Sequence, residues 1–254
     1  IWDAATGAWS RGSLPSRVQS VAGVAGAFSG EFVVVDGAAP LSQHTYENNV
    51  FLPTIDRMVG IGGASFNSGN SGRKLVDGAL VATGPWMWDP SKANGTQVGG
   101  TTGSGYLAPI IGGNMWADRR PVTTGNLAGS SIDSSTAYRL ENGRDVVYAA
   151  RMSQGSGWPT LYRYTPGDPD LGQVDLWEQG AVAYNAKSFQ SSAAIDLQNS
   201  LYVRTAFQES TGRYGLGVWD LTKINPLAPE SVRDLYIGLE FGDGSAFQTN
   251  TNFA

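Results

Sequence analysis

The sequence contains no cysteine and a single histidine, His44, in 254 residues. Without cysteine, these residues can form no disulfide, no thiolate metal site and no cysteine nucleophile. One histidine also excludes zinc sites that need several histidines, and it excludes the HExxH motif of metalloproteases.

Charged residues are scarce as well: they make up 15% of the sequence, and the formal net charge is -5. Nucleic acids and anionic membranes are bound by clustered lysines and arginines. The one dense basic pair, Arg119-Arg120, is interpreted as part of a solvated loop. No apolar run approaches the roughly 18 residues that span a bilayer. We therefore expect no nucleic-acid partner and no transmembrane segment.

Glycine and aromatic residues are abundant instead. The chain has 34 Gly, 8 Trp, 10 Tyr and 9 Phe, a composition typical of many short strands joined by glycine turns. We therefore predict an all-β fold. The many Ser, Thr, Asn and Gly residues beside few Lys favour an exported protein, with an extracellular or periplasmic location.

Two stretches of the sequence repeat one another. Residues 137–166 read as a strand, an Asn-Gly turn, an aromatic strand, a glycine loop and a second aromatic strand, and residues 194–223 repeat the pattern. An earlier copy lies at residues 46–63, where a turn at 53–56 joins two strands. Its closing aromatic strand is displaced to residues 86–90. These copies predict a series of similar small sheets.

Both ends of the chain read as incomplete repeats. Residues 1–9 hold an aromatic strand, a Thr-Gly turn and a second tryptophan, as at the end of a repeat. Residues 235–244 read as the beginning of a repeat. Since an open stack of strands leaves unpaired edges, we expect residues 1–254 to be a single domain truncated at both ends.

The earliest copies carry a more specific motif. Gly62-Gly63 closes an apolar strand and is followed, after a variable loop, by Trp88-Asp89-Pro90. Near the N-terminus, Trp2-Asp3 leads through Thr6-Gly7 to Trp9. This pattern resembles the kelch repeat, and the chain is similar to the central propeller of the galactose oxidase superfamily. The resemblance implies a kelch-like β-propeller, of which the chain holds about four blade equivalents out of about six or seven.

The sequence departs from that family in two ways. Ala149-Ala150 stands near the place of a Gly-Gly pair, and the spacings between repeats are irregular. The resemblance also raises a copper-radical oxidase, whose site uses histidines, tyrosines and a cysteine cross-linked to a tyrosine. With His44 as the single histidine and no cysteine, these residues cannot complete such a site. We therefore expect no copper.

The binding candidates lie near expected strand ends and glycine loops. His44 and Glu47 lie at a strand entry, where a structural role for the His44 ring is favoured over catalysis. No Gly-x-Ser-x-Gly elbow indicates a Ser-His-Asp triad. Trp116 and Trp158 flank glycine loops, and Arg119 completes the set. For such tryptophans, both stacking on sugar rings and packing between sheets stay open.

Carboxylates supply two further hypotheses. Asp168, Asp170 and Asp175 surround a glycine at a spacing that could gather oxygens around Ca²⁺, although an ordinary Asp-Pro turn fits the same residues. Glycoside cleavage needs two acids roughly 5 to 10 Å apart, and the sequence alone pairs none. The candidate acids are Asp36, Glu47, Asp118 and Glu240.

Two classes of function remain. The first is a non-catalytic binding or assembly module, with no catalytic residues, that presents its loops to a protein or glycan partner. It relies on expected loops at residues 64–84, 99–105 and 123–135. The alternative is a carbohydrate-active enzyme that uses carboxylates on the propeller face. Two acids that converge in one pocket, one with a raised pKa, would favour the enzyme.

Overall fold

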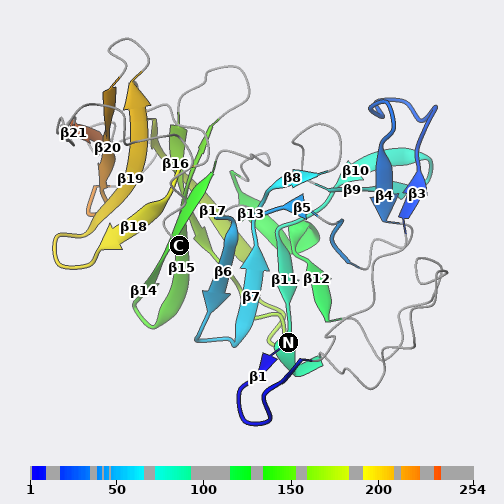
Figure 1. The fold of residues 1–254 in the computed structure, drawn as a ribbon, viewed down its shortest axis with the longest axis horizontal. Coiled ribbons are helices and arrows are strands. Elements are labelled where there is room, and N and C mark those ends of the chain that lie inside the picture. The colour runs from blue at the N-terminus through cyan, green and yellow to red at the C-terminus, as the bar shows by residue number, and fades with distance from the viewer. Residues whose placement is uncertain are drawn as a thin grey trace. The chain divides into compact units, whose positions relative to one another are not determined.

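In a computed structural model the chain is an all-β protein, as predicted (Figure 1). Its described helices are the 3₁₀ turns η1 (Pro90–Lys92) and η4 (Arg120–Val122), and no described helix has the length and apolar character needed to cross a membrane. No closed propeller or barrel is found in the part of the chain that the structure describes. That part comprises residues 2–9, 18–34, 39–41, 43–45, 47–65, 72–92, 115–126, 134–152, 159–182, 191–208, 213–223 and 232–235.

The chain divides into two compact units. The first unit holds residues 1–44 and 51–121, and the second holds residues 45–50 and 122–254. The division falls inside one strand, β6 (Asn49–Leu52). The polar sites described below belong to the second unit.

The first unit contains small sheets. The predicted turn at residues 53–56 is confirmed, with Asp56 in the left-handed region at φ 50°. It joins β6 to the next strand, β7, and the predicted aromatic strand adds to the same sheet. The sheets are β1 (Trp2–Asp3) with β2 (Ala8–Trp9); β10 (Ala79–Ala82), β9 (Arg73–Val76), β4 (Phe32–Val34) and β3 (Val18–Ser20); β12 (Trp116–Asp118), β11 (Trp86–Trp88), β7 (Arg57–Gly60) and β6; and β5 (Gln43–His44) with β8 (Ala64–Ser65).

The expected loop at residues 64–84 is wrong in part, because strands β8, β9 and β10 lie within it. An Asp77-Gly78 turn joins β9 to β10, and both turn residues have positive φ, 49° and 79°. Such a turn is a strong hairpin signal when apolar strands flank it. The many Gly, Ser and Asn residues before it in the sequence hid this signal.

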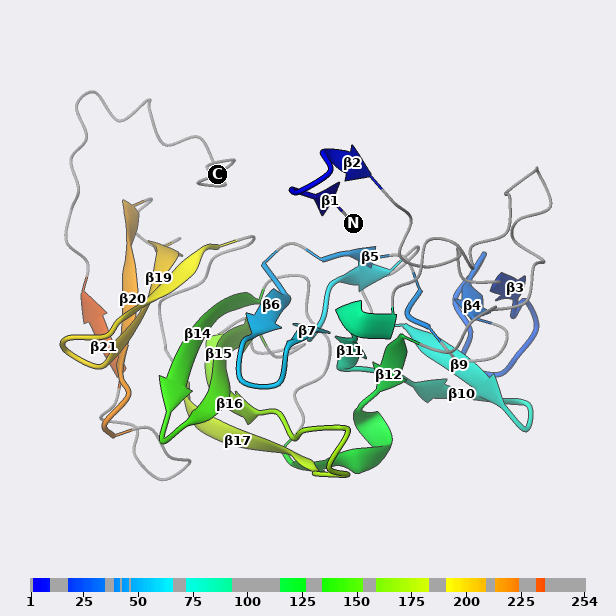
Figure 2. The same cartoon turned by 90° about the horizontal axis from the view of Figure 1, so that it is seen from below.

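The second unit is built from two antiparallel sheets in which consecutive strands are neighbours. We call the sheet of β14 (Ser135–Glu141), β15 (Arg144–Met152), β16 (Pro159–Thr165) and β17 (Asp175–Val182) the first meander. The second meander comprises β18 (Ala193–Asp196), β19 (Leu201–Gln208), β20 (Arg213–Asp220) and β21 (Val232–Leu235). Figures 1 and 2 show the two sheets side by side, with β14 next to β18.

A short extra strand, β13 (Thr123–Gly125), runs parallel to β17 at the edge of the first meander. It lies inside residues 123–135, which we expected to form a loop. Gly125 has φ +84°, and a Cβ atom there would lie 2.0 Å from the carbonyl oxygen of Trp177. This close approach requires glycine, since no side chain fits between the two backbones.

The strand order predicted for residues 137–166 and 194–223 is confirmed. The Asn142-Gly143 turn joins β14 to β15, and the equivalent turn before β19 ends on Ser200. Asn142 and Ser200 both have positive φ, 50° and 54°. The two repeats therefore place a hairpin at the same position of each meander, with a two-residue turn in the first and a four-residue turn in the second.

The two meanders share one apolar core. Tyr148 of the first meander and Tyr202 and Trp219 of the second are at most 1% exposed. The indole Nε1 of Trp219 donates a hydrogen bond to the carbonyl oxygen of Ala181, 3.2 Å away, which satisfies its polar atom inside the core. These three aromatic residues thus pack between the two sheets.

Candidate functional site

A polar cleft of about 440 Å³ lies in the second unit, at the ends of the meanders where the equivalent hairpin turns are found. Its size is within the usual range for small-molecule sites, roughly 300 to 1,000 Å³. Unlike most such sites, it is lined mainly by charged, amide and hydroxyl groups. The lining residues are Arg139, Leu140, Glu141, Asn142, Tyr148, Arg163, Glu178, Gln179, Gly180, Ser200, Leu221 and Thr222.

The register of the first meander creates the charged part of the cleft. Arg163 in β16 lies directly opposite Tyr148 in β15 on one side and opposite Glu178 in β17 on the other. Residues opposite one another in neighbouring strands project from the same face of a sheet. Glu141 ends β14 just before the Asn142-Gly143 turn, so that its side chain meets the same row.

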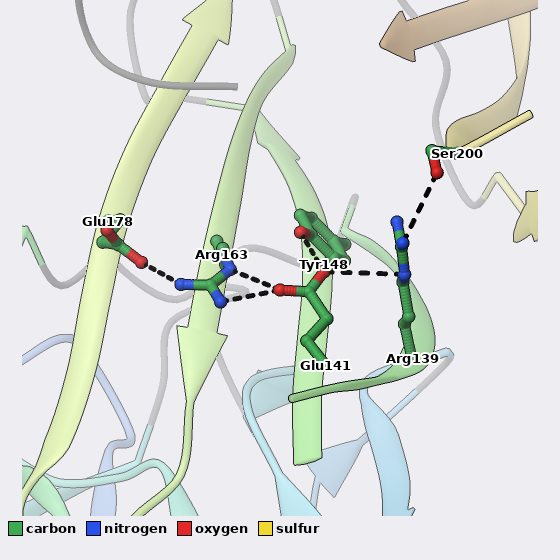
Figure 3. A network of polar contacts seen from close by, with 6 residues as sticks. All are labelled: Arg139, Glu141, Tyr148, Arg163, Glu178 and Ser200. Atoms are coloured by element: carbon green, nitrogen blue, oxygen red, sulfur yellow. Dashed lines mark hydrogen bonds and ion pairs between the residues drawn. The ribbon is translucent and has the colours of Figure 1, made fainter. Parts of the chain in front are cut away.

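Arg163 joins two carboxylates (Figure 3). Its Nη1 donates to Oε2 of Glu178 at 2.5 Å, while its Nε and Nη2 donate to Oε2 of Glu141 at 3.1 and 2.7 Å. In Figure 3 the guanidinium lies between the two acids. Three charge-assisted hydrogen bonds fix the plane of this group, which is 27% exposed.

The other oxygen of Glu141 completes the network. Its Oε1 accepts a hydrogen bond of 2.6 Å from the hydroxyl of Tyr148, and Nε of Arg139 lies 3.7 Å away. Arg139 also reaches the second meander, where its Nη2 donates to Oγ of Ser200 at 3.4 Å. The network therefore extends from β17 across the first meander to the turn that precedes β19.

The network shifts the pKa values of Glu141, Tyr148 and Arg163. Burial alone would raise the pKa of Glu141, but hydrogen bonds from Tyr148 and Arg163 and the charges of the two arginines lower it below its usual value. Burial raises the pKa of Tyr148, and its bond to Glu141 raises it further. Burial opposes the charge on Arg163, yet the bonds to both carboxylates raise its pKa. The formal charges of the two arginines and two glutamates in the network cancel.

A second polar cluster lies at the opposite end of β14, and we call it the Glu47 joint. It comprises Glu47, Ser135, Thr136, Ser192, Ala193 and Tyr202. The backbone of Glu47 pairs with Ser135 in an isolated bridge, and its carbonyl accepts a hydrogen bond from the Thr136 hydroxyl. Its carboxylate accepts hydrogen bonds from Oγ of Ser192 at 2.7 Å and from the N–H of Ala193 at 3.3 Å.

Tyr202 closes the joint from the second meander. Its hydroxyl donates to the carbonyl oxygen of Ser135 at 2.9 Å and accepts from the N–H of Ala150 at 3.3 Å. The hydroxyl oxygen of Ser135 lies 2.9 Å from the hydroxyl oxygen of Tyr202. Ser135 and Tyr202 are both fully buried, so these groups bind one another rather than a ligand.

The structure does not gather the sequence-derived binding candidates into one site. Glu47 belongs to the joint, and His44 lies in β5, paired with Ala64 of β8 in the first unit. Trp116 of β12 packs near Trp88, with ring centroids 6.4 Å apart. Trp158 lies outside the described residues. None of the candidates that the structure describes lines the cleft.

The interpretation of Arg119-Arg120 as a solvated loop is wrong. Arg119 is only 5% exposed, and its N–H donates to the carbonyl oxygen of Pro85 at 2.8 Å. Burial lowers the pKa of Arg120, and Asp118 partly offsets this effect. Asp118 also accepts hydrogen bonds from the backbone N–H groups of Gly84 and Arg120.

The residues of the calcium hypothesis make separate hydrogen bonds. Asp168 Oδ1 accepts from the N–H of Asp170 at 2.8 Å, as in an ordinary Asx turn. Asp175 is fully buried, and its carboxylate accepts from the Tyr164 hydroxyl at 2.6 Å and the N–H of Gly167 at 2.9 Å. Among the described residues, no three His, Asp or Glu side chains are arranged to hold a metal ion.

The candidate acids are likewise dispersed. Asp118 belongs to the first unit, where its carboxylate pairs with Lys74 at 3.2 Å, whereas Glu47 belongs to the second unit. Asp36 and Glu240 lie outside the described residues, as does the expected loop at 99–105. The acids that do converge, Glu141 and Glu178, were not among the candidates.

Comparison with protein-family models, with curated proteins and with solved structures finds no match to this chain. The two meanders and the cleft therefore carry the functional interpretation. Of these features, the cleft is the one that combines an open volume with ordered polar groups.

Proposed function

We propose that the chain is a non-catalytic binding module of kelch-like propeller architecture, and that it binds its partner through the cleft in the second unit. The propeller architecture is supported by two consecutive four-stranded meanders that have a hairpin at the same position and share aromatic residues in their common core. An extracellular or periplasmic location remains part of this proposal.

The Arg163 network carries the binding part of the proposal. Its side chains are already ordered by mutual hydrogen bonds, so a ligand need not immobilise them, and binding costs less conformational entropy. Glu178 nevertheless stays 44% exposed, and the cleft offers amides and hydroxyls beside it. An ordered polar surface that is still accessible is suited to recognition.

The same network disfavours the carbohydrate-active enzyme. Glu141 and Glu178 converge on one pocket, as that alternative requires, but both are bound to Arg163. The lowered pKa of Glu141 makes it a poor general acid at neutral pH, where such an acid needs a raised pKa. We therefore favour binding without turnover.

The test combines binding with product analysis. Amide chemical shifts of the protein would be recorded with neutral, acidic and basic tetrasaccharides and with short acidic and basic peptides. We expect at least one probe to shift amides of Asn142, Gln179 and Thr222, which line the cleft, while every oligosaccharide keeps its chain length on long incubation. Shifts confined to other regions would contradict binding in the cleft, and shortened oligosaccharides would contradict a non-catalytic function.

A further inference from the structure

The charge balance of the cleft points to the class of its ligand. Resting on the proposed function above, we propose that the cleft binds an uncharged, polyhydroxylated ligand, a neutral saccharide, rather than an acidic or basic one. The evidence is the pairing of its four charged groups and the kind of polar groups left around them.

The four charged side chains satisfy one another. Glu141 takes hydrogen bonds from Arg163 and Tyr148, and Arg163 also binds Glu178. An anionic ligand at Arg163 would have to displace Glu141 or Glu178 and would meet the remaining carboxylate at close range. At Arg139, whose Nε lies 3.7 Å from Oε1 of Glu141, it would again meet a carboxylate. A cationic ligand would compete with Arg163 for the same carboxylates. Either exchange leaves a partly buried charge without its partner, which is unfavourable.

The remaining lining groups suit hydroxyls. The side chains of Asn142 and Ser200 can each donate and accept hydrogen bonds, and the hydroxyl of Thr222, which donates to Oδ1 of Asp220 at 2.6 Å, can still accept one. A saccharide hydroxyl also does both, so it can bind any of these groups without a change of charge. The exposed carboxylate of Glu178 adds a strong acceptor for such hydroxyls.

The experiment compares affinities between charge classes. Cellotetraose, xylotetraose and mannotetraose serve as neutral probes, tetragalacturonate as the acidic probe and a glucosamine tetramer as the basic probe. Dissociation constants come from titrations that follow the cleft amides. We expect at least one neutral probe to bind about tenfold or more tightly than either charged probe, which corresponds to about 1.4 kcal/mol.

A variant that removes one charge tests whether the saccharide binds in the cleft. Glu178→Gln should weaken the neutral probe about fivefold and strengthen tetragalacturonate, because it removes a charged acceptor and leaves the arginines in excess. Asp170→Asn makes the same charge change on the exposed turn before β17, and we expect its affinities to stay within about twofold of the unaltered protein.

The outcomes separate this inference from the proposed function. Tighter binding of tetragalacturonate, of the glucosamine tetramer or of a charged peptide at the cleft would overturn the neutral ligand and leave the binding function in place. Equal neutral affinity in Glu178→Gln and Asp170→Asn would overturn the assignment of this ligand to the cleft. If no saccharide or peptide shifts any cleft amide, the proposed function falls together with the inference.

Discussion

The two ends of β14 lie in polar surroundings of opposite character. At the end where β14 begins, the Glu47 joint is closed: Ser135 and Tyr202 are fully buried and bind one another. At the other end, the network around Arg163 keeps Glu178 44% exposed and borders a cleft of about 440 Å³. Both clusters connect the first meander to the second.

Polar side chains serve different purposes at the two ends of β14. At the joint, hydroxyls and one carboxylate satisfy backbone groups where strands begin, as with the N–H of Ala193. In the cleft, the charged groups satisfy each other and leave amides and hydroxyls on the surface. We therefore expect substitutions at the joint to change stability, and substitutions in the cleft to change binding.

The largest loss of stability is expected from a substitution in the apolar core that the two meanders share. Trp219→Ala removes a fully buried indole from between the meanders and should lower the free energy of unfolding by about 4 kcal/mol. Urea denaturation followed by circular dichroism measures this change. Trp9→Ala is the matched control, since Trp9 is 78% exposed and should cost far less. Similar losses in both variants would mean that the shared core does not hold the meanders together.

A smaller effect is expected when the joint alone is altered. Tyr202→Phe keeps the ring but removes the hydroxyl that binds Ser135 and Ala150, which should cost about 2 kcal/mol of unfolding free energy. Urea denaturation again gives the value, and saccharide affinity in the cleft should stay within about twofold. A large loss of affinity at unchanged stability would contradict the separation of the two ends.

Much of the second unit could be predicted from its sequence. Asn142-Gly143 specifies a tight turn, and the aromatic residues that follow specify strands that pack on a neighbour. Each of these signals lies within a few neighbouring residues. The sequence alone therefore predicts the strand order of both meanders. The kelch-like motif added an expectation of a closed propeller, which depends on distant contacts that local patterns do not determine.

The cleft could not be predicted in the same way. Glu141, Arg163 and Glu178 are separated by 22 and 15 positions, and they meet because the register places Arg163 opposite Glu178. The sequence of the connection between β16 and β17, residues 166–174, does not reveal that register. Once the strand pairing is known, the signal is clear, because opposite charges face one another across neighbouring strands. Glu47 was found at a strand entry, but its role as a joint depends on Ser192, 145 positions away.

The smallest stability effect is expected in the cleft, and it depends on pH. Glu141 has a usual pKa of 4.5, which is lowered in the folded chain by the balance of burial against hydrogen bonds from Tyr148 and Arg163. Its ionised form therefore stabilises the fold above about pH 4.5, and this contribution is lost as the pH falls through the lowered value. Glu141→Gln should cost about 1.5 kcal/mol at pH 7 and less at pH 3.

Urea denaturation at both pH values checks this expectation. Glu178→Gln is the control, because its more exposed carboxylate should contribute within about 0.5 kcal/mol at either pH. A destabilisation by Glu141→Gln that is equal at pH 7 and pH 3 would mean that packing, rather than the ionised carboxylate, accounts for the loss. It would also mean that paired charges do not distinguish the cleft end of β14 from the Glu47 joint.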